Sequence, residues 1–587
     1  MKFLRNLLAT IVGLFIFFGL LFFGFVVIAA AMGGSSDKVI VKDNSVLTLD
    51  LSTVQYDYGG KFSYKDFNFS DENKDGVSNV LMAIEQAKED NRIKGISILN
   101  NVSSLGFVQR REIREQLNDF KQSGKFVVAY ADALSQGEYY LSSVADTVYV
   151  NPVGGVDFRG LSTEILYLKG LQEQTGVHME VIRHGKYKSA VEPYLEKQMS
   201  AANREQITVF LNSIWNTLVD DISKSRKVSV DSLNAIATNL AARTPDRALQ
   251  VKLIDKVAYE DEYHAGIKKA LNVDQDKDYN TVDILDYVKA GSSISKTATT
   301  DQIAVIYAQG QILNGEGNVS FIGEGSINRA LRKARKNDKV KAIVLRVNSP
   351  GGSALTSELI WREIELTKKV KPVIVSMGDL AASGGYYIAC GADHIFADPA
   401  TITGSIGVFG MLPNFSTLAT KYGVNAEQVK THQNAASYSP FRKVDESFKS
   451  EVTESIEFIY DTFVNRVAAG RGMTFEKVDE IAQGRVWTGV DALEKGLVDE
   501  LGGLGDAIAY AAKKVEIDDY KVVSYPEYEL KFNDLLRNFL GASIMQTQDE
   551  LLKEKIGQEN FEMMERLNYF QSLKGAQAIM PFEIKIQ

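Results

Sequence analysis

Residues 372–389 read Pro-Val-Ile-Val-Ser-Met-Gly-Asp-Leu-Ala-Ala-Ser-Gly-Gly-Tyr-Tyr-Ile-Ala, and this stretch predicts a strand, a tight turn and a helix. Pro372–Ser376 is short, apolar and β-branched, as expected of a buried strand, and the run after Gly384 and Gly385 is typical of a buried helix. Ser383 stands at the junction, where a hydroxyl can face the positive end of the helix dipole. A nucleophilic serine benefits there, because the alkoxide and the later oxyanion are both negative. A simple small-residue turn between sheet and helix is the alternative.

The same alternation continues on both sides of this stretch. Strands are expected at 303–307, 342–347, 372–376 and 394–397, with helices at 326–336, 354–369 and 384–391 between them. Alternating strands and helices predict a mostly parallel sheet with crossover helices, which is an α/β domain.

The chain contains this domain twice. Lys94–Leu99 aligns with Lys341–Arg346, an offset of 247 residues. The same offset pairs further residues: Gly137 with Gly384, Ala145-Asp146 with Ala392-Asp393, Gly176-Val177 with Gly423-Val424, and Pro193 with Pro440. A unit this long is a whole domain rather than a solenoid repeat. We expect a first copy at 45–275, a linker at 276–300, a second copy at 301–515 and a C-terminal helical tail at 516–587.

The N-terminus predicts a membrane anchor over residues 1–36. Lys2 and Arg5 precede an uncharged apolar run from about residue 7 to residue 32. Roughly 20 apolar residues span a bilayer, and the apolar part of a cleavable signal peptide is shorter. The basic residues predict a cytoplasmic N-terminus, with the bulk of the chain on the other side of the membrane. Cleavage near Ala29–Ala31 is the alternative.

The composition argues against two kinds of partner. The chain has 587 residues and a net charge of −9, and no basic region stands out, so we expect no nucleic-acid partner. Its one cysteine, Cys390, excludes an intramolecular disulfide. No ligand-like spacing is found among the five histidines, which are His178, His184, His264, His394 and His432. We therefore expect chemistry that needs neither a metal nor another cofactor.

The two copies differ where a catalytic site is expected. The offset places Gln136 opposite Ser383, so the first copy lacks the serine. It also lacks the paired glycines of the second copy, Gly351 and Gly352, which follow a predicted strand. Amides of that turn, together with the amide of Gly384, would form an oxyanion hole. A lone pair of glycines is more often a tight turn, but the loss of both features together favours a function.

A serine nucleophile needs a base, and the sequence offers several candidates. His394 and His432 are nearest in sequence, but neither has an evident carboxylate to orient it. The first copy contains Lys186 and Lys188, whereas Ala435 stands opposite Lys188 in the second copy. A lysine can act as a general base when burial lowers its pKa. Lys186 and Lys188 would share a face of a strand, so the residues alone leave both open.

Four motifs together resemble the signal peptide peptidase A family in its long, tandem-domain form, also called protease IV. They are Val347-Asn-Ser-Pro-Gly-Gly-Ser353, Met377-Gly-Asp-Leu-Ala-Ala-Ser-Gly-Gly-Tyr-Tyr387, Thr403-Gly-Ser-Ile-Gly-Val408 and Gly185-Lys-Tyr-Lys-Ser-Ala-Val-Glu-Pro193. The resemblance implies a ClpP/crotonase-like α/β fold in each copy and a Ser/Lys dyad that hydrolyses peptide bonds. It places the nucleophile on Ser383 and the general base on Lys188. We expect Ser405 to orient the lysine.

The resemblance also implies a setting for this activity. Members are single-pass proteins of the bacterial inner membrane, with the catalytic part on the periplasmic side, and they assemble into bowl-shaped homo-oligomers, expected to be tetramers. Their substrates are the signal peptides left after secretion. Two alternatives belong to other classes: a crotonase-type acyl-CoA enzyme, which needs no serine nucleophile, and a non-catalytic membrane scaffold.

Overall fold

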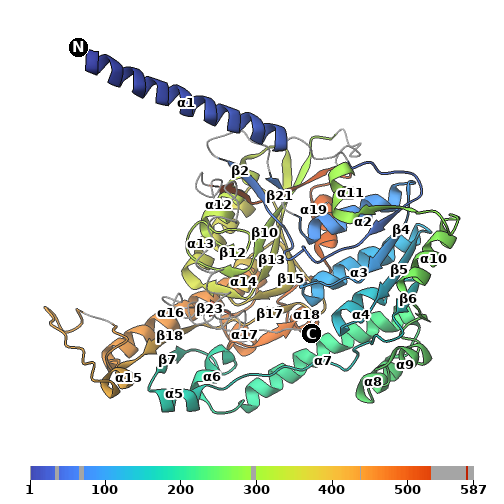
Figure 1. Cartoon of the computed structure of the whole chain (residues 1–587). Coiled ribbons are helices and arrows are strands. Elements are labelled where there is room, and N and C mark those ends of the chain that lie inside the picture. The colour runs from blue at the N-terminus through green and yellow to red at the C-terminus, as the bar shows by residue number, and fades with distance from the viewer. Residues whose placement is uncertain are drawn as a thin grey trace.

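The computed structural model of this chain describes residues 2–33, 39–64, 72–73, 75–291, 299–435, 438–530 and 577–579. Helix α1 (Lys2–Gly33) projects from the body as one long rod (Figure 1). Its segment Arg5–Gly24 has 20 residues and a mean hydropathy of 2.6, and none of it is covered by the rest of the chain. This helix is long and apolar enough to cross a membrane, a property that signal sequences share.

The first repeat is built on a parallel sheet of six strands in the order β8-β6-β5-β4-β1-β9. These strands are β1 (Ser45–Thr48), β4 (Ile93–Leu99), β5 (Phe126–Ala131), β6 (Thr147–Val150), β8 (Lys256–Val257) and β9 (Asn280–Asp283). The helices are α2 (Val77–Glu89), α3 (Phe107–Gln122), α4 (Gln136–Ser142), α5 (Lys169–Thr175), η1 (Ser189–Val191), α6 (Glu192–Leu195), α7 (Ala201–Arg226), α8 (Val230–Thr238), α9 (Pro245–Gln250), α10 (Glu260–Ala270) and α11 (Ile284–Gly291).

The prediction of a linker at 276–300 is wrong for residues 280–291, which form β9 and α11 of the first repeat. Strand β9 pairs in parallel with β1 and completes the edge of the first sheet. Helix α11 follows it and buries Ile284 and Tyr287 in the core of this repeat. Pairing with a strand more than 200 residues earlier in the chain orders this segment, and such a contact leaves no local signal.

The second repeat is built on an eight-stranded sheet whose main path is β19-β17-β15-β13-β10-β21. Its strands are β10 (Gln302–Gln309), β13 (Val340–Ser349), β15 (Val373–Ala382), β16 (His394–Ala397), β17 (Ile402–Gly404), β19 (Val486–Thr488), β20 (Glu500–Leu501) and β21 (Lys521–Tyr525). Its helices are α12 (Glu324–Lys336), α13 (Ala354–Lys368), α14 (Gly384–Ala389), α15 (Ser416–Lys421), α16 (Glu446–Arg471), α17 (Phe475–Ile481), α18 (Gly489–Glu494) and α19 (Leu504–Lys514).

Both faces of this second sheet are buried, as expected for a mostly parallel sheet. Along β10, Ile303 and Val305 pack with α19, whereas Ala304 and Ile306 pack with α12. The strands and helices predicted from the alternation in this half of the chain are all present, with ends shifted by a few residues.

Two smaller sheets join parts of the chain that are far apart in sequence. One has the order β12-β11-β14-β23-β18-β7, with β7 (His178–Arg183), β11 (Gln311–Ile312), β12 (Phe321–Ile322), β14 (Gly351–Ser353), β18 (Phe409–Asn414) and β23 (Gln577–Ile579). The other has the order β22-β2-β3, with β2 (Lys61–Tyr64), β3 (Glu72–Asn73) and β22 (Glu527–Leu530). The described part of the C-terminal tail is thus strand rather than helix. Two segments of this tail have apolar residues at helical spacing, Leu530–Leu540 and Phe561–Phe570. They lie outside the described residues except for Leu530, which ends β22.

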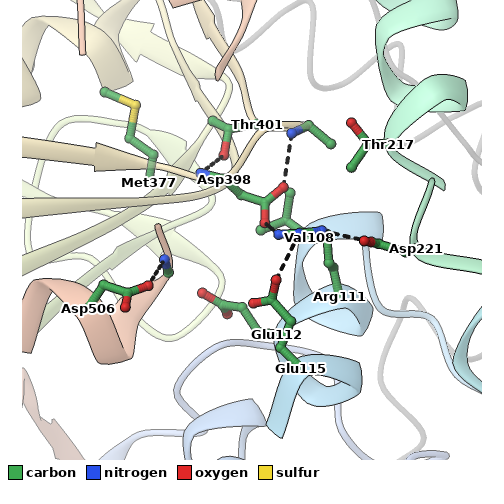
Figure 2. A network of polar contacts seen from close by, with 12 residues as sticks. Val108, Arg111, Glu112, Glu115, Thr217, Asp221, Met377, Asp398, Thr401 and Asp506 are labelled. Atoms are coloured by element: carbon green, nitrogen blue, oxygen red, sulfur yellow. Dashed lines mark hydrogen bonds and ion pairs between the residues drawn. The ribbon is translucent and has the colours of Figure 1, made fainter. Parts of the chain in front are cut away.

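Ion pairs hold the two repeats against each other. Arg111 of α3 pairs with Asp398 of the second repeat at 2.5 Å, and with Glu115 and Asp221 of the first at 2.7 and 2.9 Å (Figure 2). Arg346 of β13 is fully buried and donates to Asp57 at 3.1 Å and to both oxygens of Glu112 at 2.7 and 2.9 Å. Each arginine therefore joins carboxylates across the contact between the repeats.

Candidate active site

Ser383 occupies the turn between β15 and α14 that the sequence predicts. Its backbone has φ 55° and ψ −113°, a conformation that non-glycine residues rarely adopt and that is found most often at functional sites. The Ser383 amide donates to the carbonyl of Gly404 at 2.8 Å, and the Ser383 carbonyl accepts from Tyr387 of α14. This sharp turn holds the hydroxyl at the N-terminal end of the helix, fully buried in the closed site.

Lys188 reaches the second repeat from the first. Strand β7 pairs antiparallel with β18, and the chain continues through Gly185, whose φ of +95° makes the turn. Beyond that turn, the Tyr187 amide donates to the carbonyl of Gln483 at 3.0 Å. The Lys188 Nζ then lies 2.8 Å from the Ser383 Oγ, to which it donates a hydrogen bond. The two residues are 195 positions apart in the chain.

Ser405 contacts the same lysine. The Lys188 Nζ donates to the Ser405 Oγ and to the Ser405 carbonyl, both at 3.1 Å. Ser405 has φ 51°, and its amide donates to the Arg485 carbonyl at 2.7 Å, so its backbone is fixed. The Nζ of Lys188 thus contacts three oxygens, and none of them belongs to a carboxylate.

The lysine side chain is enclosed by backbone. A Cβ added to Gly484 would lie 2.7 Å from the Cβ of Lys188, and one added to Gly407 would lie 3.2 Å from its Cδ. Burial without a charged partner lowers the pKa of Lys188 well below its usual value near 10.5. The neutral amine is the form that can accept a proton, so the site favours a base at this position.

The other candidate bases lie outside the site. Lys186 is exposed, and its Nζ sits 5.0 Å from the centre of the Tyr187 ring. His394 contacts Glu500 at 3.3 Å and stacks on Tyr510, and it pairs with Ile374 at the end of β15 away from Ser383. His432 is exposed. In the part of the chain that the structure describes, no cluster of three or more His, Cys, Asp and Glu residues could hold a metal ion.

Three glycines predicted for the oxyanion hole surround the same point. Gly351 and Gly352 have φ values of +97° and +154°, which glycine adopts without strain. A Cβ on Gly351 would lie only 2.7 Å from the Gly384 nitrogen, so the two backbones are in close contact. Gly384 is the first residue of α14, where an amide has no partner within the helix. The Gly351 amide instead donates to the Ser349 hydroxyl at 3.1 Å.

The corresponding position of the first repeat is filled by Gln136. Its Oε1 accepts from the amides of Arg159 and Gly160 at 3.0 Å each, and its Nε2 donates to the Gly160 carbonyl at 3.1 Å. The offset of 247 residues maps Gly160 onto Gly407, whose carbonyl lies 3.5 Å from the Ser383 Oγ. Gln136 therefore forms hydrogen bonds with backbone groups of the first repeat whose equivalents face Ser383 in the second repeat. The first repeat has no nucleophile at this position.

A known protein family matches both repeats. The model of peptidase family S49 matches residues 119–274 and 365–518, which are more than half of the chain and part of each repeat. The chain belongs to peptidase family S49. As a member of that family it is a serine peptidase.

Its S49 relatives match most of its length. Protease 4 of Haemophilus influenzae is 37% identical over 497 residues, which are 81% of this chain and 79% of that protein. The chloroplastic serine protease SPPA of Arabidopsis thaliana is 36% identical over 469 residues, which are 78% of this chain and 69% of that protein. A solved mutant ClpP1 of Listeria monocytogenes matches 36% of this S49 chain and 95% of its own, at 14% identity and a TM-score of 0.24.

Some features of the S49 site have no signal in the sequence alone. Gly407 belongs to the motif Thr403–Val408, but the motif does not indicate that this glycine lies against Lys188. Gly484 lies almost 300 residues after the lysine that it encloses, and nothing nearby indicates its role. Strand β23 is likewise held by long-range pairing with β14 and β18, beside the glycines.

Proposed function

We propose that the chain is a membrane-anchored endopeptidase in which Ser383 is the nucleophile and Lys188 the general base. It would degrade cleaved signal peptides and other apolar peptides. One observation carries this proposal: a buried lysine without a charged partner lies 2.8 Å from a serine hydroxyl on a strained turn. The structure offers no comparable base to Ser383 among the described residues.

The reaction would proceed through an acyl-enzyme. Neutral Lys188 takes the proton of the Ser383 hydroxyl as the Ser383 Oγ attacks the scissile carbonyl. Protonated Lys188 then gives this proton to the leaving amine. In the second half of the reaction, Lys188 removes a proton from water, the hydroxide releases the acyl group, and the proton returns to Ser383.

Backbone amides would stabilise the tetrahedral oxyanion. Gly384 is the first donor, because its amide begins α14 directly after the nucleophile. The turn formed by Gly351 and Gly352, which lies against the Gly384 amide, would supply the second. Ser405 would hold the Nζ of Lys188 toward the serine through its two contacts at 3.1 Å.

Helix α1 and the resemblance together support the proposed substrate class and location. An uncleaved α1 would tether the peptidase to the bacterial inner membrane, with Lys2 and Arg5 in the cytoplasm and both repeats on the periplasmic side. A catalytic site held near the membrane surface has access to apolar segments that leave the bilayer, and signal peptides are such segments.

The experiment that tests this function uses the full chain in detergent micelles with a synthetic signal peptide. We expect the wild-type protein to cut the peptide at internal bonds, as measured by mass spectrometry of the fragments. Ser383→Ala should reduce the rate by about 10⁴-fold or more, because no acyl-enzyme can form.

Two outcomes would contradict the proposal in different ways. A folded wild-type chain that cuts no peptide would favour the non-catalytic scaffold. Turnover of an acyl-CoA thioester that persists in Ser383→Ala would favour a crotonase-type enzyme.

We also propose a homo-oligomer. One strand pairing between the two repeats has an equivalent pair of segments elsewhere in the chain, and that second pair does not form a strand pairing within the chain. Within the chain, β7 of the first repeat pairs with β18 of the second. The offset of 247 maps β7 onto residues 425–430 and β18 onto residues 162–167. Neither segment forms a strand, and Val429 and Leu166 are strongly exposed. Pairing of these segments between neighbouring chains would be a head-to-tail contact that can close a ring, with four chains as the expected number.

A charge at this surface should therefore dissociate the oligomer. We expect Val429→Asp to convert it to monomers, because the buried carboxylate would have no partner. Analytical ultracentrifugation in detergent measures the change. Val153→Asp is the matched control, since Val153 is equally exposed but lies outside both segments. Equal sedimentation of both variants and the wild type would rule out this interface.

A further inference from the structure

Strand β15 bulges shortly before it reaches Ser383. The pairing of β15 with β13 is regular up to Met377, and it resumes at Ala381 after β13 has advanced by only two residues. Residues 378–380 of β15 therefore stand opposite a single residue of β13. A β-bulge bends its strand and changes the direction of the side chains beyond it, and bulges are common beside active sites. This bulge thus helps to determine where the Ser383 hydroxyl lies.

The single residue of β13 opposite the bulge is Asn348. Its Oδ1 accepts from the Leu380 amide at 3.1 Å, and a Cβ on Gly378 would lie 2.9 Å from the Asn348 Cγ. Just before β17, the Thr401 hydroxyl donates to the Gly378 carbonyl at 2.8 Å. These contacts hold the backbone of the bulge within the second repeat, whereas its middle residue, Asp379, contacts the first repeat.

The Asp379 carboxylate caps helix α3 of the first repeat. The amide of Val108, in the first turn of this helix, donates to the Asp379 Oδ1 at 2.7 Å. Gly106 precedes the helix and has no side chain to accept from this amide. A Cβ on Gly106 would lie 2.2 Å from the Asp379 Cγ, so glycine allows the carboxylate to approach. Amides of a first helical turn lack partners within the helix, and a carboxylate is a favourable acceptor for them.

The equivalent aspartate of the first repeat has different partners. The offset of 247 residues maps Asp379 onto Asp132, which is exposed. Asp132 accepts from groups of its own repeat, the Tyr130 hydroxyl at 3.1 Å and the Asn151 Nδ2 at 3.0 Å. Among the described residues, the contact with a helix of the other repeat therefore belongs to the aspartate that precedes the nucleophile.

The placement of the first repeat matters because this repeat supplies Lys188. The Lys188 Nζ lies 2.8 Å from the Ser383 Oγ, and a shift of α3 against β15 would change this distance. The Arg111–Asp398 pair also holds α3 against the second repeat (Figure 2). Asp379, however, lies on β15 itself, four residues before the nucleophile. Displacing a reacting group by about 1 Å can reduce a rate by about 10²-fold.

We propose that Asp379 is a positioning residue of the active site: by capping α3, it fixes the strand that ends at Ser383 relative to the repeat that supplies Lys188. Asp379 touches neither the substrate nor the reacting atoms. It acts on the reaction through the alignment of the serine hydroxyl with the lysine amine. This inference rests on the proposed function, since it adds a residue to the same site.

Asp379→Ala should lower kcat by about 10–100-fold and leave KM within about two-fold of the wild-type value, because the dyad loses its alignment. Asp379→Asn should restore most of kcat, since an asparagine oxygen accepts from a first-turn amide as well as a carboxylate does. Asp132→Ala is the matched control, and we expect its kcat to stay within about two-fold of wild type. The full chain in detergent micelles, with a fluorogenic apolar peptide, gives both constants.

Gly106→Ala tests the same contact from the other repeat. Gly106 has a φ of −69°, which alanine adopts without strain, and the nearest new neighbours of the methyl group are the atoms of the Asp379 carboxylate. We expect Gly106→Ala alone to lower kcat by about 10-fold. Added to Asp379→Ala, it should have little further effect, because the shorter side chain leaves room for the methyl group.

The pH profile separates a positioning role from a purely structural one. A misaligned site encloses Lys188 less closely, so the rise of kcat/KM with pH should move to higher pH in Asp379→Ala. A lower Tm with an unchanged kcat and pH profile would show a purely structural contact and overturn the inference. Additive effects of Gly106→Ala and Asp379→Ala on kcat would also overturn it.

A probe that needs no peptide separates this inference from the proposed function. An alkyl fluorophosphonate reacts with an activated serine: the bond between Oγ and phosphorus forms, fluoride leaves, and the hydroxyl proton passes to the base. If the wild-type chain cut no peptide, but Asp379→Ala still slowed labelling of Ser383 by about 10-fold, the positioning role would stand and the peptidase assignment would fail. If the wild type cut peptides and Asp379→Ala changed neither labelling nor kcat, only the inference would fail.

Discussion

Lys188→Ala should lower kcat/KM for peptide hydrolysis by about 10⁴-fold, close to the effect of removing the nucleophile itself. A general base supplies about 10²–10⁴ in rate, and residues that act as a unit lose nearly all of it when one is removed. The Nζ of Lys188 lies 2.8 Å from the Ser383 Oγ, so this substitution removes the amine that contacts the hydroxyl. A fluorogenic apolar peptide and the full chain in detergent give the rate.

Lys186→Ala is the matched control for this variant. It removes the same side chain two residues away, and Lys186 is exposed and in contact with Tyr187, so we expect a rate within about two-fold of wild type. Loss of peptidase activity in Lys186→Ala, with full activity in Lys188→Ala, would assign the general base to Lys186. That result would contradict the role proposed for Lys188.

The pH profile of the wild type should report the same lysine. Only the neutral amine accepts a proton, so kcat/KM should rise with pH through the pKa of Lys188 and then level off. Because burial lowers this pKa, the rise should occur well below pH 10.5. A rise centred near pH 10.5 would mean that the lysine is solvated in the working enzyme.

Arg346→Met should destabilise the folded chain by about 3–5 kcal/mol. The substitution keeps most of the side-chain volume but leaves Asp57 and Glu112 buried without their shared cation. Breaking a buried ion pair from one side typically has an effect of this size. Thermal unfolding followed by circular dichroism should show a clearly lower Tm.

Arg159→Met serves as the comparison for the stability measurement. Arg159 and its partner Asp157 are both exposed, and such pairs contribute about 0–1 kcal/mol. We expect its Tm to stay close to that of wild type. Equal Tm values for Arg346→Met and Arg159→Met would show that the contact between the repeats does not depend on Arg346.

The strands and helices of the second repeat can be predicted because each depends mainly on residues that are close together in the sequence. Strand β16 spans the predicted residues 394–397, and α13 ends within one residue of its predicted end. Alternation of apolar strands with amphipathic helices is readable from neighbouring residues. The turn at Ser383 was found for the same reason, since the strand, the serine and the paired glycines are contiguous.

Features built from distant segments could not be predicted in this way. Strand β9 depends on β1, β23 depends on β14 and β18, and the burial of Lys188 depends on Gly407 and Gly484. Each of these contacts joins residues more than 160 positions apart, and a single sequence contains no record of such a pairing. The internal repeat supplies part of the missing information, because Gln136 and Ala435 indicate which copy lacks the serine and which lacks the lysine.

The separation of Lys188 and Ser383 by 195 residues also sets an order of events during synthesis. A ribosome makes the lysine first, and the growing chain lacks Ser383 until 195 further residues have been translated. Strands β17, β18 and β19 must then fold before Ser405, Gly407 and Gly484 can enclose the amine. A chain truncated between the repeats thus contains Lys188 but not Ser383, and we expect it to have no peptidase activity.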